Sequence, residues 1–383
     1  MPVLWPFTPT SVEERMVFNT NVRRAYAGEY RDGLRDAVQI MTHSLTREDQ
    51  EAASMELLYR TQPLGEWYVP LWHDGTRYKN SISPGETVFT VETDADYRAG
   101  GQVAFIYDYQ TAEVVDVVSA TGGTLTIAAS PGLTLNYPGT NSDPVMICPV
   151  VTALAPEGFN RSDRPVVGDM GITFYSIEPL DLADTLYPTF GLYDAVDDPS
   201  VVINPISGVS LQNNEFEVQA VGSFFLEDLE DRIRKTSRYS VLKTSYADRW
   251  AIRKWLHRIR GRDRPFWLPS WKADFRVTSA SSGTSVVIAD PSPVSTTDVE
   301  GLNLNFYNEV TKQSTRLTVS SVIDNLNGNW TLLLSGSVTV DEETPVSIMR
   351  LVRFNTDEIL ISHRVTQEGF ITTYEASVIE TLE

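Results

Sequence analysis

The sequence predicts a mainly β protein of the α+β class, in which one domain occurs twice in tandem. Three observations predict this fold: an aromatic and proline motif that occurs twice, an amphipathic helix before each copy of the motif, and a series of short β-forming runs after it. Each copy is expected to be a β-sandwich or barrel-like domain with one amphipathic helix. Each is also expected to carry a small inserted antiparallel β-domain.

The repeated motif gives the spacing of the two copies. It begins at Trp67 in the first copy and at Phe266 in the second, 199 positions later. Weaker matches follow in the same order, such as 101–107 with 301–307. Because large rings bury much apolar area, the motif is expected to have the same packing role in both copies. Its aromatic and proline members are Trp67, Tyr68, Pro70, Trp72, Phe266, Trp267, Pro269 and Trp271.

The spacing also predicts the domain boundaries. The first domain is expected to span residues 1–185, with its inserted β-domain at about 79–148. The second is expected to span 186–383, with its insert at about 277–347. The boundary is placed in the acidic, proline-containing stretch 180–205, which is interpreted as the link between the copies.

A helix is expected just before each motif. Thr46 and Ser245 are residue types that favour the N-cap of a helix, and an Asp lies three positions after each, as in a capping box. After Ser245, apolar residues recur at helical spacing at 252, 255, 256 and 259. When the motif copies are aligned, the apolar stripe of the first helix falls out of register, because Glu56 aligns with Trp255.

Short β-runs separated by turn residues follow each motif. Gly122-Gly123 and Asn327-Gly328 are typical of tight turns between such runs. The spacing of the runs predicts a small antiparallel barrel or sandwich in each copy. The runs are 88–91, 103–107, 114–118, 125–127 and 146–151 in the first copy, and 286–288, 302–307, 317–322, 330–334 and 346–352 in the second.

Composition narrows the function classes. The chain has 383 residues, a formal charge of −20 and a pI near 4.6, so nucleic-acid binding is not expected, because it needs cationic side chains. No apolar run is long enough to span a bilayer, and the start of the chain lacks the pattern of a signal peptide. With a single cysteine, Cys148, no intrachain disulfide forms, and we expect a soluble protein folded in a reducing compartment.

No motif for catalysis, a metal or a cofactor was found, and we expect a protein that is not an enzyme. The histidines, at positions 43, 73, 257 and 363, have no metal-ligand spacing and are interpreted as ordinary surface or partly buried residues. Cys148 lies in an apolar run, which favours a buried structural thiol. Asp94-Ala95-Asp96 and Asp197-Asp198 favour solvated loop charge over calcium sites. Paired carboxylates for glycan cleavage stay an open alternative.

A basic segment stands out in this acidic chain. Lysines and arginines crowd between Arg232 and Arg276. We expect this segment to form an interface with an acidic neighbour, with intrachain ion pairs as the main alternative and nucleic acid as the weakest. The candidate interface residues are Arg249, Arg253, Lys254, Arg258, Arg260, Arg262 and Arg264.

Several segments together resemble tail proteins of long-tailed, siphovirus-like bacteriophages. They are Trp5-Pro6-Phe7, Asn19-Thr20-Asn21-Val22, Gly28-Glu29-Tyr30-Arg31, Leu34-Arg35-Asp36 and the first aromatic motif. The group includes minor tail, distal tail and tail-tip hub proteins. The resemblance covers both copies in outline, although the second copy departs from it at 228–230.

The resemblance implies a structural component of the tail tip or baseplate. Such a protein is made in the host cytoplasm, resides in the virion, forms a ring around the tail axis and docks other tail proteins. It implies no catalytic residues, no cofactor and no contact with a membrane. Three copies of a duplicated chain would present six similar units, so the self-assembly is expected to be a trimer or hexamer ring. The alternative is a receptor- or carbohydrate-binding module that contacts a host surface glycan through the inserted β-domains.

Overall fold

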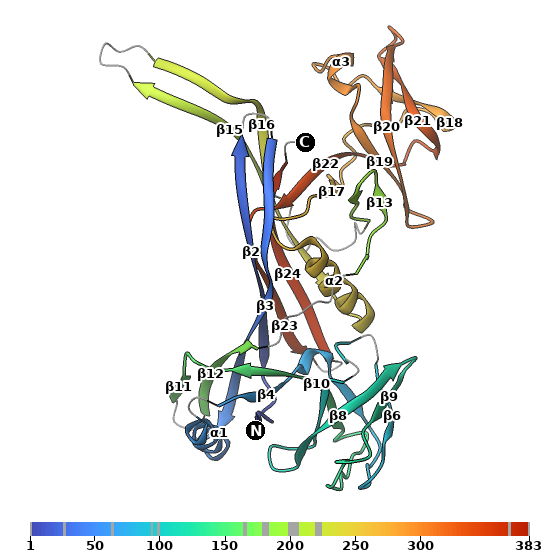
Figure 1. Ribbon diagram of the computed structural model, residues 1–383. Helices are drawn as coiled ribbons and strands as arrows, with labels where there is room; N and C mark the ends of the chain where they lie inside the picture. The colour runs from blue at the N-terminus through green and yellow to red at the C-terminus, as the bar shows by residue number, and fades with distance from the viewer. Residues whose placement is uncertain are drawn as a thin grey trace.

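The computed structural model describes residues 2–25, 28–62, 65–92, 95–97, 100–163, 167–177, 184–197, 207–218, 224–366 and 369–381. The protein is mainly β, with 54% strand and 11% helix, and the expectation of a mainly β fold is confirmed. Most of the strands join one large antiparallel sheet (Figure 1). No helix in the described part of the chain is long and apolar enough to cross a membrane.

A series of long antiparallel strands extends along the molecule (Figure 1). Both the N-terminal and the C-terminal half of the chain contribute strands to it. Each strand pairs with the next in the run. In spatial order the strands are β15 (Ser207–Val218), β16 (Phe224–Lys243), β24 (Gly369–Glu380), β23 (Glu358–Thr366), β2 (Ser11–Ala25), β3 (Gly28–Glu48), β12 (Val167–Ser176) and β11 (Phe159–Asp163).

The alternation of side chains explains why one face of these strands is buried. In β2, Val12, Met16 and Phe18 point inward, while Glu13 and Arg15 between them are half-buried. A strand places successive side chains on opposite faces, so this period of two directs the apolar set to one core. The hairpins β2–β3 and β15–β16 extend this run of strands toward the upper end of the molecule in Figure 1.

A second group of strands in the N-terminal half surrounds its own apolar core, which includes Phe89, Phe105 and Tyr137. β10 connects this group to the long strands, because it pairs with β4, β5, β7 and β12. The strands around this core are β5 (Thr76–Tyr78), β6 (Val88–Thr90), β7 (Gln102–Ile106), β8 (Ala112–Thr121), β9 (Thr124–Ile127) and β10 (Val145–Leu154). The elements β1 (Val3–Leu4), β4 (Trp67–Pro70) and η1 (Trp72–Asp74) come before them and contribute to other apolar clusters.

The C-terminal half has a comparable group around a core that includes Phe275, Phe306 and Trp330. β22 connects it to the long strands by pairing with β17, β19 and β24. The elements around this core are β18 (Ser281–Ala289), α3 (Thr296–Val299), β19 (Asn303–Asn308), β20 (Gln313–Asp324), β21 (Asn329–Val340) and β22 (Val346–Phe354). β17 (Phe266–Pro269) comes before them and belongs to the core beneath α2 through Phe266.

Several strand pairs recur at the sequence spacing of the motif. Val69 of β4 pairs with Val151 of β10, and Leu268 of β17 pairs with Arg350 of β22, 199 positions later on both strands. Thr42 pairs with Thr173 between β3 and β12. Two hundred positions later, residue 242 of β16 pairs with residue 373 of β24. The register of these pairs is therefore alike in the two halves.

The two helices that precede the motifs differ at their N-termini. α2 (Tyr246–Ile259) begins after Ser245, whose hydroxyl accepts a hydrogen bond from the backbone N–H of Asp248, as predicted. The prediction of Thr46 as an N-cap is wrong. β3 continues to Glu48 because it pairs with β12 as far as that residue, and α1 (Asp49–Thr61) begins only there. Thr46 instead donates from its hydroxyl to Asp169 of β12.

The expected link between the halves is only partly described, since 178–183 and 198–206 lie outside the described residues. Residues 184–197 include the small hairpin β13 (Thr189–Phe190) and β14 (Tyr193–Asp194) and pack against α2. Tyr187 contacts the ring of Trp255, and Asp194 is buried. The described part of the link is therefore held against the second half.

Candidate functional site

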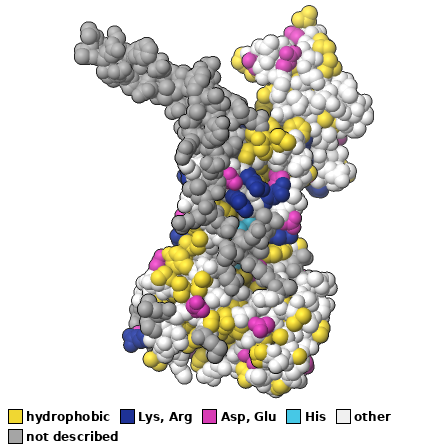
Figure 2. All heavy atoms as spheres, viewed as in Figure 1, with side chains coloured by type: hydrophobic (Ala, Val, Ile, Leu, Met, Phe, Trp, Pro, Cys, Tyr) yellow, Lys and Arg dark blue, Asp and Glu magenta, His cyan; other side chains and the backbone are white. Residues whose placement is uncertain are grey.

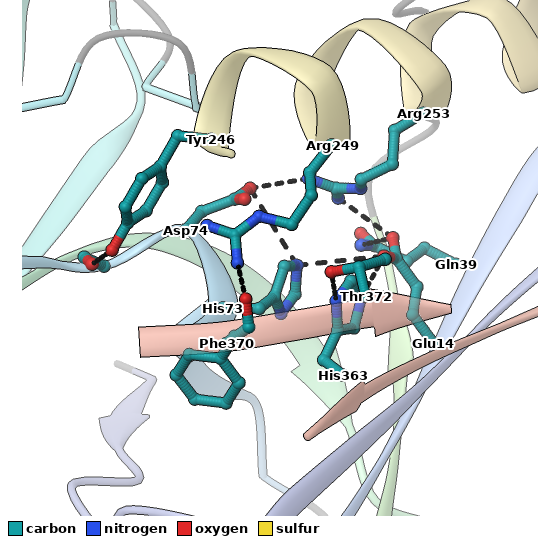
Figure 3. A network of polar contacts seen from close by, with 11 residues as sticks. Glu14, Gln39, His73, Asp74, Tyr246, Arg249, Arg253, His363, Phe370 and Thr372 are labelled. Carbon is teal, nitrogen blue, oxygen red and sulfur yellow. Dashed lines mark hydrogen bonds and ion pairs between the residues drawn. The ribbon is translucent and has the colours of Figure 1, made fainter. Parts of the chain in front are cut away.

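A buried polar network lies where the two halves of the chain meet. We call this meeting place the central junction: β23 pairs with β2 from Ser11↔Arg364 to Val17↔Glu358, and α2 packs over these strands. Figure 3 shows the polar side chains that point toward one another beneath α2. They come from both halves, namely Glu14, Gln39, His73 and Asp74 from the first and Arg249, Arg253, His363 and Thr372 from the second.

Glu14 is the centre of the network and is fully buried. Gln39 donates to its Oε1 from Nε2 at 2.6 Å, and Arg253 donates to the same oxygen at 2.9 Å. Its Oε2 lies 3.2 Å from Nε2 of His363. A carboxylate can only accept, so His363 donates here from Nε2, and its Nδ1 accepts from the Thr372 hydroxyl at 2.8 Å.

Arg253 connects the halves directly. Its Nη1 donates to Oδ2 of Asp74 at 2.5 Å, while its Nη2 binds Glu14. Two further α2 residues bind backbone at the junction: Arg249 donates to the carbonyl of Phe370 at 2.5 Å, and Tyr246 donates to the carbonyl of Gly75 at 2.8 Å. Tyr246, Arg249 and Arg253 thereby anchor successive turns of α2 to the residues beneath it.

Local structure explains the place of Asp74. The short helix η1 turns the chain immediately after β4, and Trp72, His73 and Asp74 are all buried. Gly75 closes this turn against β10, where an added Cβ would lie 2.5 Å from the sulfur of Cys148. Only glycine allows that approach without displacing the strand.

Each charged group in the network stabilises the charged form of its neighbour. Burial alone would raise the pKa of Glu14, but the Arg253 guanidinium and the hydrogen bond from His363 hold it well below its ordinary value. Burial alone would lower the pKa of Arg253, but Glu14 and Asp74 keep it above its ordinary value. The network therefore contains an ionised Glu14 and a permanently charged Arg253, a pairing that a low-dielectric interior requires.

Two neutral imidazoles complete the network. Burial lowers the pKa of His73 and of His363, and the nearby Arg253 adds to this effect. The two rings stack with centroids 3.8 Å apart and planes 8° apart. Neither ring nitrogen of His73 has a hydrogen-bond partner among the described residues, and its Nε2 lies 3.7 Å from Glu14.

Glu14, His73 and His363 have the composition of a metal site, since one ligand atom of each lies within 4.8 Å of the others. The geometry does not fit a bound metal. A metal lies about 2 Å from an imidazole nitrogen and in the plane of that ring, and two stacked rings with nearly parallel planes share no such point. Arg253 also forms an ion pair with the carboxylate of Glu14, and the positive charge of its guanidinium repels a cation.

The residues of the predicted basic interface do not lie together on one exposed surface. Arg249 and Arg253 are buried inside the chain and are not available to a neighbour. Figure 2 shows Lys and Arg side chains gathered on the surface beside α2. Of the predicted set, Lys254 pairs with Asp184, Arg258 with Asp194 and Arg262 with Asp357, while Arg264 is exposed and Arg260 caps α2 in the left-handed region at φ 56°. An interface role stays a prediction for Lys254, Arg258, Arg260, Arg262 and Arg264.

The aromatic motif has similar burial in the two halves except at its last tryptophan. Trp67 and Phe266 are buried in the main cores, where Trp67 contacts Trp5 and Tyr59, and Phe266 contacts Trp255. Both prolines, Pro70 and Pro269, are buried, and Tyr68 and Trp267 are half-buried. The last tryptophan differs: Trp72 is fully buried, whereas Trp271 is half-buried and contacts Tyr307.

Other predicted residues lie as follows. Cys148 is buried and burial raises the pKa of its thiol, so the expectation of a buried thiol is confirmed. All four histidines are buried, which corrects the expectation of surface or partly buried side chains. Asp96 is buried and Asp197 pairs with Arg316, so neither is a solvated charge, while Asp94 and Asp198 lie outside the described residues.

The network was missed because its members are far apart in the sequence. A signal does exist: Glu14 and His363 occupy inward positions of strands whose neighbours at those positions are apolar, Met16 beside Glu14 and Ile361 beside His363. A polar residue in a buried register requires a partner. Comparison with known proteins adds no identity, since no protein-family model matches the chain and no curated protein is significantly similar to it.

Proposed function

We propose that the protein is a structural subunit of the tail tip or baseplate of a long-tailed bacteriophage, where copies form a ring around the tail axis and dock neighbouring tail proteins. The proposal includes a tandem duplication with an inserted β-domain in each copy. It assigns no catalytic step and no cofactor to the chain. The phage assignment is supported by the sequence resemblance, and the ring by the topology of the long strands.

The observation that carries the ring is the order of strands at the central junction. The set β15-β16-β24-β23 is followed directly by the set β2-β3-β12-β11. Each set consists of a hairpin, the last strand of its half and the strand before that one. The junction joins the last strand of one set, β23, to the first strand of the other, β2.

This order leaves two complementary edges. Among the described residues, β11 pairs only with β12, and β15 pairs only with β16. Unpaired sheet edges are ready templates for another strand. If β11 of one copy joins the β15 edge of the next in the way that β23 joins β2, the contact is head to tail. Such a contact closes into a ring when the rotation allows it. Three chains then supply six four-strand sets around the axis.

The carbohydrate-binding alternative depends on exposed aromatic rings. Among the described residues, the aromatic side chains of the regions 79–148 and 277–347 are buried or half-buried. No observation in these regions favours sugar stacking, and we therefore retain the ring as the proposed function.

The test is the mass of the purified chain, measured by multi-angle light scattering and followed by electron microscopy of the same fractions. We expect a particle of three or six chains with a central channel. A chain that stays monomeric at every concentration tested, a closed particle with another number of chains, or an assembly without a channel would contradict the proposal.

A further inference from the structure

Positions in α1 and α2 can be compared by counting from their N-caps, Glu48 and Ser245. Eight positions after its N-cap, α2 has Arg253 and α1 has Glu56. Arg253 is fully buried because α2 covers the central junction. Glu56 is half-buried and pairs with Arg161 of β11 at 3.0 Å. The position of Arg253, which α2 buries at the junction, is therefore partly accessible on α1, whereas the position of Arg249 belongs to Ala52, which is fully buried in the core of its own half.

This accessible surface, which we call the α1 face, surrounds an open pocket beside β11. Leu57 on the same helix has 63% of its surface exposed, and the rings of Tyr59 and Phe159 stack at 6.1 Å. In α2 the place of Tyr59 belongs to Leu256, which is fully buried. The α1 face consists of Glu56, Leu57, Tyr59, Arg60, Phe159 and Arg161.

The same comparison between the two halves identifies a second surface, which corresponds to the residues that α2 covers. At the central junction α2 covers η1, which follows the first aromatic motif. The corresponding residues after the second motif are 270–274, which we call the Trp271 segment. Trp271 is half-buried with φ 53°, a region that non-glycine residues rarely adopt, and Lys272 is exposed. Where Trp72 and His73 are fully covered within the chain, their counterparts Trp271 and Lys272 are not.

We infer that the α1 face of one copy binds the Trp271 segment of the next copy, as α2 binds η1 within one chain. This contact rests on the ring proposed above and names its residues. Glu56, the counterpart of Arg253, faces Lys272, the counterpart of His73, so the carboxylate of this ion pair lies on the helix. Arg161 faces Asp274, which is also exposed. The Trp271 indole covers Leu57 and the stacked rings beside it.

Complementary charge gives this contact its direction. A contact between two α1 faces would leave a surplus of positive charge, because each face offers one carboxylate, Glu56, with two arginines, Arg60 and Arg161. Opposite charges placed across a contact favour one pairing and penalise the wrong one. The partner that fits the α1 face is therefore a second copy of this chain, bound head to tail.

The test is a charge exchange in the full-length chain, with ring formation measured by sedimentation velocity. Glu56→Lys and Lys272→Glu are each expected to raise the apparent dissociation constant by about tenfold or more. The double variant, in which the two charges are exchanged, is expected to restore assembly to within about threefold of the original chain. Glu342→Lys and Lys312→Glu, which make the same changes at exposed sites in the second half, are expected to have no effect.

Leu57→Asp serves as a second disruptive variant, because Leu57 is exposed and its replacement leaves the core intact. It is expected to stay folded by thermal melting and to abolish the ring. Assembly of Glu56→Lys, Lys272→Glu and Leu57→Asp to the same extent as the controls would overturn the contact while leaving the ring proposal in place. Failure of the double variant to recover would also overturn it. Failure of the unmodified chain to assemble would contradict the ring itself.

Discussion

The two long helices occupy comparable places before their motifs but stabilise the protein in different ways. Within the described residues, α1 packs on strands of its own half, through the small and flexible apolar residues Ala52 and Met55. α2 covers strands of both halves and adds two buried arginines to its apolar stripe. The comparison teaches that the polar network is a property of contact between halves, because the helix that makes no such contact has none.

The largest expected effect comes from the ion pair that only α2 makes. Arg253→Ala leaves Glu14 and Asp74 buried without their cation, and we expect a loss of about 3–5 kcal/mol in the free energy of unfolding. The matched change in α1 is Arg60→Ala, which removes an exposed pair with Glu56 and is expected to cost less than about 1 kcal/mol. Urea denaturation followed by tryptophan fluorescence measures both. Equal losses would contradict the special role of the junction.

The apolar stripes of the helices give the next comparison. Trp255 is fully buried against Phe266 and Phe354, so Trp255→Ala is expected to cost about 3–5 kcal/mol through lost burial and a cavity. Its counterpart counted from the N-cap is Leu58, which is only half-buried, and Leu58→Ala is expected to cost less than about half as much. Calorimetric unfolding measures the two losses. A larger loss for Leu58→Ala would reverse the ranking of the two cores.

The pH dependence of the free energy of unfolding has one contribution from the junction and another from His43 in the N-terminal half. Burial lowers the pKa of His43 to about 3, below its unfolded value of about 6.5, so its stability contribution is complete above pH 6.5 and is lost as the pH falls. Between pH 7.5 and pH 5 this one residue is expected to remove about 2 kcal/mol.

His43→Gln is expected to remove that part of the pH dependence and to leave the part due to the junction. Glu14, His73 and His363 also have lowered pKa values, so their contributions have the same sign. Unfolding free energies measured in urea at both pH values provide the test. An unchanged pH dependence in His43→Gln would show that this imidazole is not held neutral.

The smallest expected effect concerns the helix N-termini. Ser245→Ala removes the hydroxyl that caps α2 and is expected to cost about 1 kcal/mol. Glu48→Ala is expected to cost close to nothing, because Glu48 makes no side-chain cap of α1. Both are measured by urea denaturation. A substantial loss for Glu48→Ala would indicate a role for this side chain that its cap geometry does not provide.

The β class, the strand runs and the capped start of α2 could be predicted from sequence because they depend on local patterns. Thr46 was mistaken for an N-cap because a capping pattern also fits a strand, and pairing of β3 with β12 decides the outcome there. Counting from the observed N-caps places Trp255 opposite Leu58 instead of Glu56, which removes the mismatch of the two helical stripes.

The network was less predictable than the fold. His73 and His363 stack although 290 positions separate them, and no local spacing reports such a contact. The basic segment shows that composition alone does not predict whether a charged side chain is exposed or buried. Charge density was visible in the sequence, but whether Arg253 faces a neighbour or the interior depends on the strands beneath it.

Cys148 gives this chain a built-in reporter for the opening of the junction. The thiol lies in a small apolar cluster with Trp72 of the first half and Phe370 of the second. The thiol is fully buried and burial raises its pKa, so a thiol reagent reaches it only when this cluster opens. The rate of labelling in the native protein therefore reports the local opening of this cluster, to which both halves contribute.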